Sequence, residues 1–291
     1  MFRRAVVTDE VSQEPEVAIR LALRFHLDGL EIRSLWNKGP HELTPAEVRT
    51  LRAMIHDAGL AVCAVATPCF KCSLDDPAEV RAHLDILRRC QHLCAELEAP
   101  IARIFTFWRP EDGVWNDRAA VIADRLVEAA EIVQAGGLRL GIENEPSVWG
   151  SNCARVAALV RRAAHPALGA IWDPGNDVYD AEGEQPFPDG YVAVRSQIVH
   201  VHVKDAHRDA QTGAVSATAL GDGDIPLPAI FSRLTEDGYS GFVSLETHYR
   251  IGGPLSDEVM RLPRGAAFSA GGEEASELCL QRWAGILAAM P

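Results

Sequence analysis

Four side chains that could bind a metal ion stand at the ends of four successive predicted strands. They are Glu143, Asp173, His202 and Glu246. Three carboxylates gathered in a protein interior would cost several kcal/mol unless a cation neutralised them. Oxygen-rich ligation with one imidazole suits Mn²⁺ best, and Mg²⁺, Co²⁺ and Zn²⁺ are alternatives. The pattern therefore predicts one divalent metal ion.

The choice of His202 rests on its place in the strand. His200 and His202 are two residues apart in a predicted strand, so both side chains point to the same side of the strand. His202 lies nearer the carboxyl end, and His200 is expected to be a buried hydrogen-bonded partner. The alternative for each residue alone is an isolated loop group or a helix cap. Four such residues at consecutive strand ends favour the shared metal site.

Eight short apolar runs alternate with longer amphipathic ones. The predicted strands span residues 4–8, 29–33, 61–66, 102–107, 138–143, 169–173, 198–204 and 241–246. The predicted helices span residues 14–25, 45–57, 77–98, 117–134, 152–164, 226–236 and 273–289, with a weaker one at 185–197. This alternation predicts an α/β fold, a (β/α)₈ TIM barrel that forms a single domain over residues 1–291.

An open doubly wound sheet is the competing architecture. That fold usually has a glycine-rich turn after its first strand, whereas Val7, Thr8, Asp9 and Glu10 occupy this position. In a parallel barrel, chemistry gathers where the strands end, which is where the four candidate ligands lie. The irregular stretch 247–272 follows Glu246 directly. We expect it to be a lid or a subunit contact, which leaves a homo-oligomer open.

At this point four segments resemble a known family. The segments are LGIENE at 140–145, WDPGN at 172–176, HVHVKD at 200–205 and SLE at 244–246. They are similar to the xylose isomerase-like barrel superfamily, which includes sugar and sugar-phosphate isomerases and epimerases. The resemblance covers nearly the whole chain, and it indicates the superfamily more strongly than it indicates a substrate.

The resemblance implies roles for particular residues. The four strand-end residues would hold the metal, and Glu143 and Glu246 would also form the catalytic acid/base pair. Arg208, six residues after His202, would contact substrate oxygens. The epimerases place a histidine three residues after the strand-six aspartate, but Asn176 stands there. This departure puts ordinary free-ketose epimerase activity in doubt.

The expected chemistry is proton transfer on a sugar or another hydroxy-carbonyl compound. A metal ion that polarises the carbonyl stabilises the enediolate formed when a carboxylate removes the neighbouring proton. Return of the proton to the same carbon gives epimerisation, and return to the next carbon gives isomerisation. Loss of a β-hydroxyl gives dehydration, so an inosose or dehydroshikimate dehydratase is the alternative function.

The three lysines fall at or just after predicted strand ends. They are Lys38, Lys71 and Lys204, among 28 basic residues. An ammonium group suits a phosphate, a carboxylate or a developing oxyanion, so the lysines suggest an anionic or carbonyl-bearing substrate, and a coincidence of small numbers is the alternative. Lys71 and Lys204 are therefore predicted to bind substrate. Asn176 and Glu145 are also predicted substrate-binding residues, with Glu145 alternatively supporting Glu143.

Bulk composition excludes some functions. The net charge of −13 disfavours nucleic-acid binding, and with it the abasic-site endonucleases that share this architecture. A non-catalytic binding protein is disfavoured by the intact Glu143 and Glu246. No apolar run approaches a membrane span or a signal peptide, so a cytoplasmic protein is expected. The seven cysteines are expected to be free thiols.

Overall fold

The computed structural model describes residues 2–180, 183–261 and 263–290. Its main sheet is a closed barrel of parallel strands in the order β1-β10-β7-β6-β5-β4-β3-β2, which confirms the predicted (β/α)₈ fold. The barrel strands are β1 Arg3–Val7, β2 Gly29–Ile32, β3 Ala61–Ala66, β4 Ile101–Ile104, β5 Arg139–Glu143, β6 Leu168–Trp172, β7 Ile198–Val203 and β10 Phe242–Leu245. Each predicted strand overlaps one of them.

The chain divides into two compact units. Unit 1 comprises Met1–Gly39, Leu43–Cys63 and Val201–Pro291, and unit 2 comprises Pro40–Glu42 and Ala64–His200. Unit 1 contains His202 and Glu246, whereas unit 2 contains Glu143 and Asp173. That residues 1–291 form a single domain stays a prediction.

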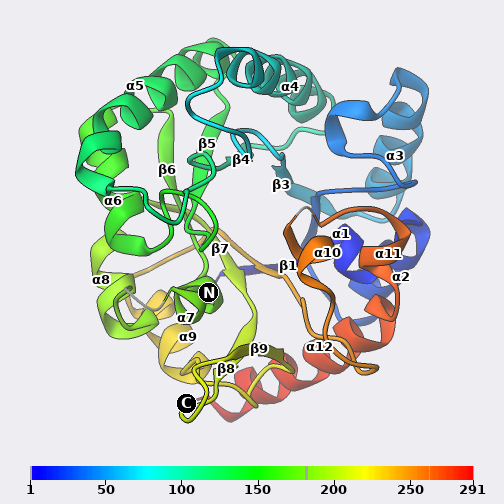
Figure 1. Cartoon of the computed structure of the whole chain (residues 1–291). Helices are drawn as coiled ribbons and strands as arrows, with labels where there is room; N and C mark the ends of the chain where they lie inside the picture. Colours follow the sequence, from blue (N-terminus) through cyan, green and yellow to red (C-terminus); the bar gives the residue numbers. More distant parts are fainter. Residues whose placement is uncertain (1, 181–182, 262, 291) are drawn as a thin grey trace. The chain divides into compact units, whose positions relative to one another are not determined.

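Unit 2 carries β4, β5 and β6 in register, with Glu143 paired to Ile171. Its helices α4 Pro77–Glu96, α5 Trp115–Gln134 and α6 Cys153–Ala163 lie outside these strands (Figure 1). Helix α4 begins where the Asp76 side chain accepts hydrogen bonds from two backbone N–H groups of the first turn. Gly169 allows the close approach of the next strand, because a Cβ there would lie 2.3 Å from Val199.

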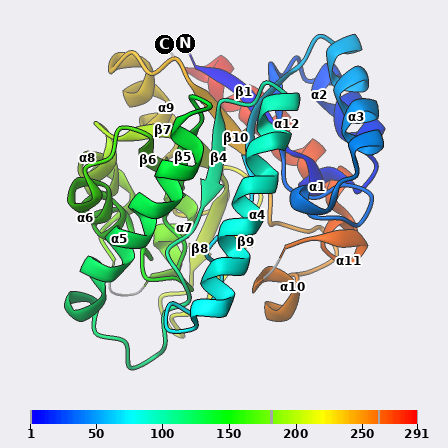
Figure 2. The same cartoon turned by 90° about the horizontal axis from the view of Figure 1, so that it is seen from above.

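Unit 1 pairs β1 with both β2 and β10, and β10 with β7. Its larger helices are α2 Pro15–Arg24, α3 Pro45–Asp57, α9 Leu227–Glu236 and α12 Gly272–Ala289. The predicted capping box at the start of α3 is present, since the Thr44 and Glu47 side chains each bind the other's backbone N–H. The short helix α1 Thr8–Val11 follows β1 and packs beside α11 Gly265–Ser269 (Figure 2).

Several short elements differ from the predictions. The helix expected at 185–197 is wrong in extent: a π-helical segment, Pro186–Gly190, precedes the short α8 Tyr191–Val194. Two prolines near its start lack backbone N–H donors, which prevents a continuous helix there. The stretch 247–272 is not wholly irregular, because it contains α10 Asp257–Arg261 and α11, while residue 262 lies outside the described residues.

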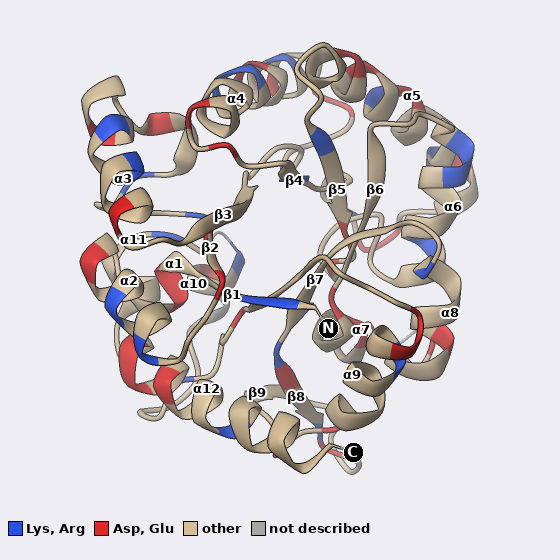
Figure 3. Cartoon of the chain, turned by 180° about the vertical axis from the view of Figure 1, so that it is seen from behind, with Lys and Arg blue, Asp and Glu red and all other residues tan. Residues whose placement is uncertain are grey.

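Charges of both signs occur on the same outer helices, such as α4 and α5 (Figure 3). Within the described ranges, every helix is too short or too polar to span a lipid bilayer. All seven cysteines are buried free thiols, as predicted. Burial raises the pKa of the Cys72 and Cys94 thiols to about 12, so these side chains are packing groups rather than nucleophiles.

Candidate active site

Unit 1 brings His202 and Glu246 together. His202 lies on β7 opposite Ser244 of β10, and the Glu246 backbone N–H donates to the Val203 carbonyl at 3.0 Å. This register places His202 Nδ1 3.7 Å from Glu246 Oε2, and both side chains are almost completely buried. Two of the four predicted ligands therefore face each other.

The Glu246 carboxylate is held between two cations. Lys204 Nζ lies 2.6 Å from Oε2, and Arg33 Nη1 lies 2.6 Å from Oε1. Burial raises the pKa of the Glu246 carboxyl, but Lys204 and the other positive groups around it hold that pKa well below its ordinary range. Glu246 is therefore ionised, and the predicted substrate residue Lys204 binds this carboxylate.

Arg33 is surrounded by three carboxylates. Besides Glu246, its Nε lies 2.8 Å from Asp9 Oδ1 and its Nη2 lies 2.8 Å from Glu10 Oε1. Its guanidinium group also lies 4.7 Å from the centre of the Phe268 ring. Burial raises the pKa of Asp9 to about 6, even though Arg33 lowers it. This cluster was not predicted, although the two acidic residues Asp9 and Glu10 directly after the first strand were a usable signal.

Arg250 ties the segment after Glu246 to this cluster. Its Nη1 lies 3.3 Å from Glu10 Oε2, and its Nη2 and Nε donate to the carbonyls of Phe268 and Ala270. His248 Nε2 lies 3.3 Å from Glu10 Oε1. Burial, together with Lys204, lowers the pKa of His248 to about 4. The segment predicted to be a lid or a subunit contact is therefore anchored beside Glu246.

Glu31 contacts the other nitrogen of the His202 ring. His202 Nε2 lies 3.1 Å from Glu31 Oε1 and 3.2 Å from Oε2. Both side chains are inaccessible to solvent. The imidazole therefore has one carboxylate at each of its two nitrogens.

Unit 2 positions Glu143 at the last residue of β5. Arg103 Nη1 lies 3.1 Å from Glu143 Oε2, and the Asn176 amide donates to Oε1 at 3.3 Å. The same amide donates to the Asn144 carbonyl at 2.8 Å. Asn176, predicted to bind substrate, thus contacts the predicted catalytic carboxylate and is itself buried.

Asp173 follows β6 and begins α7 Pro174–Tyr179. Its Oδ1 accepts hydrogen bonds from the backbone N–H groups of Gly175 and Asn176, so it is the N-cap of this helix. Asn144 fixes the backbone at the same point, because it accepts from the Asp173 N–H at 2.9 Å and donates to the Asp173 carbonyl at 2.8 Å. The helix-cap role is thus present, and the role as metal ligand stays a prediction.

Asn144 also joins Asp173 to a buried acid. Its amide donates to Asp177 Oδ1 at 2.9 Å, and the Cys153 thiol donates to Asp177 Oδ2 at 3.2 Å. Burial raises the pKa of Asp177 well above its ordinary range, although the hydrogen bonds from Cys153 and Asn144 lower it. This network holds the residues that follow β5 and β6 in place.

Lys71 and Glu145 meet in an aromatic setting within unit 2. Lys71 Nζ lies 3.5 Å from Glu145 Oε1 and 4.5 Å from the centre of the Phe105 ring. Phe70 and Phe107 both have positive φ angles and stack at 4.4 Å. Such backbone conformations are costly and occur preferentially where a site imposes them. The two predicted substrate residues are therefore paired beside strained aromatic loops.

Arg208 lies on an unpredicted hairpin of unit 1. The hairpin pairs β8 Asp205–Arg208 with β9 Val215–Thr218, and the buried Asp205 carboxylate accepts hydrogen bonds from backbone N–H groups of the chain that follows β9. The Arg208 guanidinium donates to the Gly213 carbonyl at 3.2 Å. Its predicted contact with substrate stays a prediction. Lys38, the remaining lysine, forms an ion pair with Glu47 at 2.6 Å.

A family model described as the xylose isomerase-like TIM barrel matches residues 19–269. The chain belongs to the xylose isomerase-like TIM-barrel family. The uncharacterized protein MJ1311 of Methanocaldococcus jannaschii is similar in sequence to this family member. The two are 22% identical over 235 residues, which cover 77% of each protein.

Several solved structures are similar in fold to this xylose isomerase-like chain. D-allulose 3-epimerase from Methylomonas sp. has a TM-score of 0.74 at 14% identity, and 98% of each chain is covered. The probable 3-DHS dehydratase AsbF from Bacillus anthracis has a TM-score of 0.74 at 14% identity, covering 97% of this chain and 99% of its own. The IOLI protein with a bound zinc atom has a TM-score of 0.73 at 17% identity, covering 99% and 98%. At these identities the likeness establishes the fold alone.

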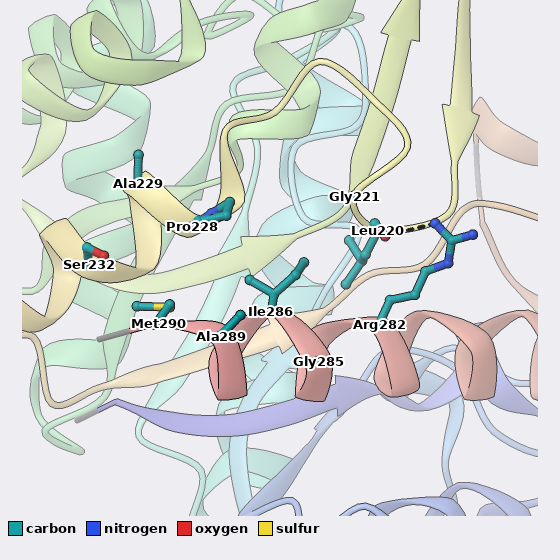
Figure 4. A pocket seen from close by; sticks show the side chains of 10 residues that line it. All are labelled: Leu220, Gly221, Pro228, Ala229, Ser232, Arg282, Gly285, Ile286, Ala289 and Met290. Atoms are coloured by element: carbon teal, nitrogen blue, oxygen red, sulfur yellow. Dashed lines mark hydrogen bonds between the residues drawn. The ribbon is translucent and has the colours of Figure 1, made fainter.

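This family member also has an apolar groove on the outside of unit 1, between α9 and α12. Pro228 and Ala229 of α9 face Ile286 and Ala289 of α12 across it, and Arg282 donates to the Leu220 carbonyl at its rim (Figure 4). None of the residues that line this groove is a predicted ligand or substrate residue.

Proposed function

We propose that this chain is a divalent-metal-dependent isomerase or epimerase of a sugar or a related hydroxy-carbonyl compound. One observation carries the proposal: acidic and imidazole side chains end four strands, β5, β6, β7 and β10, that are neighbours in the barrel order. Parallel barrels collect the carboxyl ends of their strands at one rim, where the active sites of such enzymes lie.

The donor set fits a divalent cation. Glu143, Asp173, His202 and Glu246 would hold the ion, and three carboxylates with one imidazole suit Mn²⁺, with Mg²⁺, Co²⁺ or Zn²⁺ as alternatives. The zinc in the IOLI structure supports a metal centre on this fold. When bound, the ion would polarise the substrate carbonyl and increase the acidity of the neighbouring carbon.

The protein's own residues would then move and position protons. Glu246 is ionised and would accept a proton from the carbon next to the carbonyl, and Lys204 and Arg33 hold its carboxylate in place. Glu143 would be the opposing acid/base group, with Asn176 at its Oε1. Lys71, Glu145 and Arg208 would orient the substrate hydroxyl and carbonyl groups.

The test is a deuterium wash-in screen with the Mn²⁺-loaded protein in D₂O. Ketoses, inososes and hydroxy-keto acids are offered, and solvent deuterium is located by NMR. Deuterium at the carbon next to the carbonyl, lost after chelation and in Glu246→Gln, is the expected result. The exposed variant Glu16→Gln is the matched control. Exchange that persists fully after chelation would contradict the proposal.

Dehydration is the second candidate, and the similarity to AsbF is the reason to test it. The same incubations are monitored for unsaturated or deoxy-keto products. Stoichiometric loss of a hydroxyl group would assign the chain to the lyases. Deuterated substrate or its isomer, without loss of water, would assign it to the isomerases.

A further inference from the structure

We propose that Glu31 is a positioning residue that fixes the ring of His202, with the Nε2 proton directed at Glu31 and the Nδ1 lone pair directed towards Glu246. The inference rests on the proposed metal-binding role of His202. It adds a residue outside the four proposed ligands, on a strand that supplies none of them.

The contact between Glu31 and His202 is short and enclosed. Nε2 lies within 3.2 Å of both Glu31 oxygens, and neither side chain is accessible to solvent. A carboxylate oxygen accepts hydrogen bonds, and Nε2 is the ring nitrogen within hydrogen-bond distance of Glu31, so the geometry places the ring hydrogen on Nε2.

The proton on Nε2 determines what Nδ1 can do. A neutral imidazole has one N–H, so its other nitrogen presents a lone pair. His202 Nδ1 lies 3.7 Å from Glu246 Oε2, a separation that two ligands of one ion can adopt. A carboxylate behind a ligating histidine selects the tautomer and the ring orientation in many metal sites, and its loss typically weakens metal affinity about 10–100-fold.

The sequence of β2 supports a positioning role for this strand. Glu31 lies near the end of β2, and Arg33 directly follows its last residue, Ile32. Glu31 reaches His202, and Arg33 reaches Glu246. Both unit 1 side chains of the proposed metal site are thus contacted from the end of β2, which β1 separates from β10 in the barrel order.

The first test uses the unmodified protein loaded with diamagnetic Zn²⁺. Long-range ¹H–¹⁵N NMR of the histidine rings at neutral pH distinguishes the two neutral tautomers from the doubly protonated ring, and His202→Gln identifies the His202 signals. The expected spectrum shows a neutral ring protonated at Nε2. A ring protonated at Nδ1, or at both nitrogens, would overturn the inference.

The second test measures Mn²⁺ binding by calorimetry in Glu31→Gln. The glutamine amide can donate as well as accept, so it no longer selects one tautomer. We expect Mn²⁺ affinity to fall about 10–100-fold, while the exposed variant Glu16→Gln keeps the affinity of the unmodified protein. A folded Glu31→Gln protein that binds Mn²⁺ within threefold of the unmodified protein would refute the inference.

The two readouts separate this inference from the proposed function. If the wash-in screen fails but the Nε2 tautomer and the loss of Mn²⁺ affinity are observed, the positioning role of Glu31 stands and only the reaction is wrong. If Glu31→Gln does not fold, the NMR measurement on the unmodified protein still decides the tautomer.

Discussion

The two units support their candidate ligands by different interactions. In unit 1, Glu246 is held by the full charges of Lys204 and Arg33. In unit 2, Asp173 is held by the amide of Asn144 and by backbone N–H groups. Glu143 is intermediate, since it contacts both a guanidinium group and the Asn176 amide.

The difference shows two ways to keep a carboxylate in place. Buried charge pairs fix the ionisation state, but removal of one partner leaves an uncompensated charge in a medium that solvates it poorly. Neutral hydrogen bonds fix direction and make smaller individual contributions. We therefore expect substitutions in unit 1 to have larger effects than equivalent substitutions in unit 2.

The largest expected effect follows the loss of a catalytic charge. Glu246→Gln keeps the shape of the side chain but cannot accept the substrate proton, so the deuterium exchange rate should fall about 10²–10⁴-fold. Glu143→Gln, measured in the same assay, shows whether Glu143 contributes as much to the exchange rate as Glu246 does. Exchange by Glu246→Gln within threefold of the unmodified protein would contradict its proposed role.

Next in size is the removal of the shared cation of unit 1. Arg33→Met leaves three buried carboxylates without their common partner, and the free energy of unfolding should fall by about 3–5 kcal/mol. Urea denaturation followed by circular dichroism measures the change. Arg33→Lys keeps the charge but cannot make three directed contacts, so an intermediate loss is expected.

Arg20→Met is the matched control for Arg33. Its ion pair with Glu273 is largely exposed, so its loss should cost about 1 kcal/mol or less. Equal losses for Arg20→Met and Arg33→Met would remove the distinction between buried and exposed charge pairs.

A smaller effect is expected in unit 2 from Asn144→Ala. The change removes the amide contacts to Asp173 and Asp177, and the buried groups left unsatisfied should cost about 1–3 kcal/mol of unfolding free energy. The exposed Asn116→Ala serves as the control in the same urea experiment. A loss larger than that of Arg33→Met would reverse the comparison between the units.

The smallest effect concerns pH. Burial raises the pKa of Asp177, so the folded protein holds this proton more tightly than the unfolded chain does. The associated stability is complete below the ordinary aspartate pKa and is lost as pH rises through the raised value. Asp177→Asn should therefore make the unfolding free energy depend less on pH between the ordinary aspartate pKa and the raised value, as measured by urea titrations at several pH values. The exposed Asp85→Asn should leave the pH dependence unchanged.

The barrel could be predicted because its strands are continuous apolar runs separated by amphipathic helices. The candidate ligands were visible for the same reason, since each is a polar residue that ends or follows an apolar run. Their shared role as ligands stays a prediction. Strand 102–107 was predicted too long, because Phe105 and Phe107 leave the sheet to donate to the carbonyls of Cys69 and Phe70.

The ion-pair cluster of unit 1 could not be predicted in the same way. Arg33 lies 24 residues from Asp9 and 213 residues from Glu246, and no periodic pattern links these positions. Glu31 is an acidic residue in an apolar run, but His202 lies 171 residues away and no local pattern links the two. The hairpin of β8 and β9 was equally hard to predict, because its strands are short and its structure depends on hydrogen bonds to the buried Asp205 carboxylate.

Arg250 has a consequence for redesign of the protein. It donates to the carbonyls of Phe268 in α11 and of Ala270, which follows α11, and it pairs with Glu10. At the start of α11, the Ala266 N–H donates to Asn37. The stretch between Arg250 and Gly265 therefore begins and ends at fixed points. A new peptide could be grafted there, with its length and composition varied, while Phe268 stays in place over Arg33.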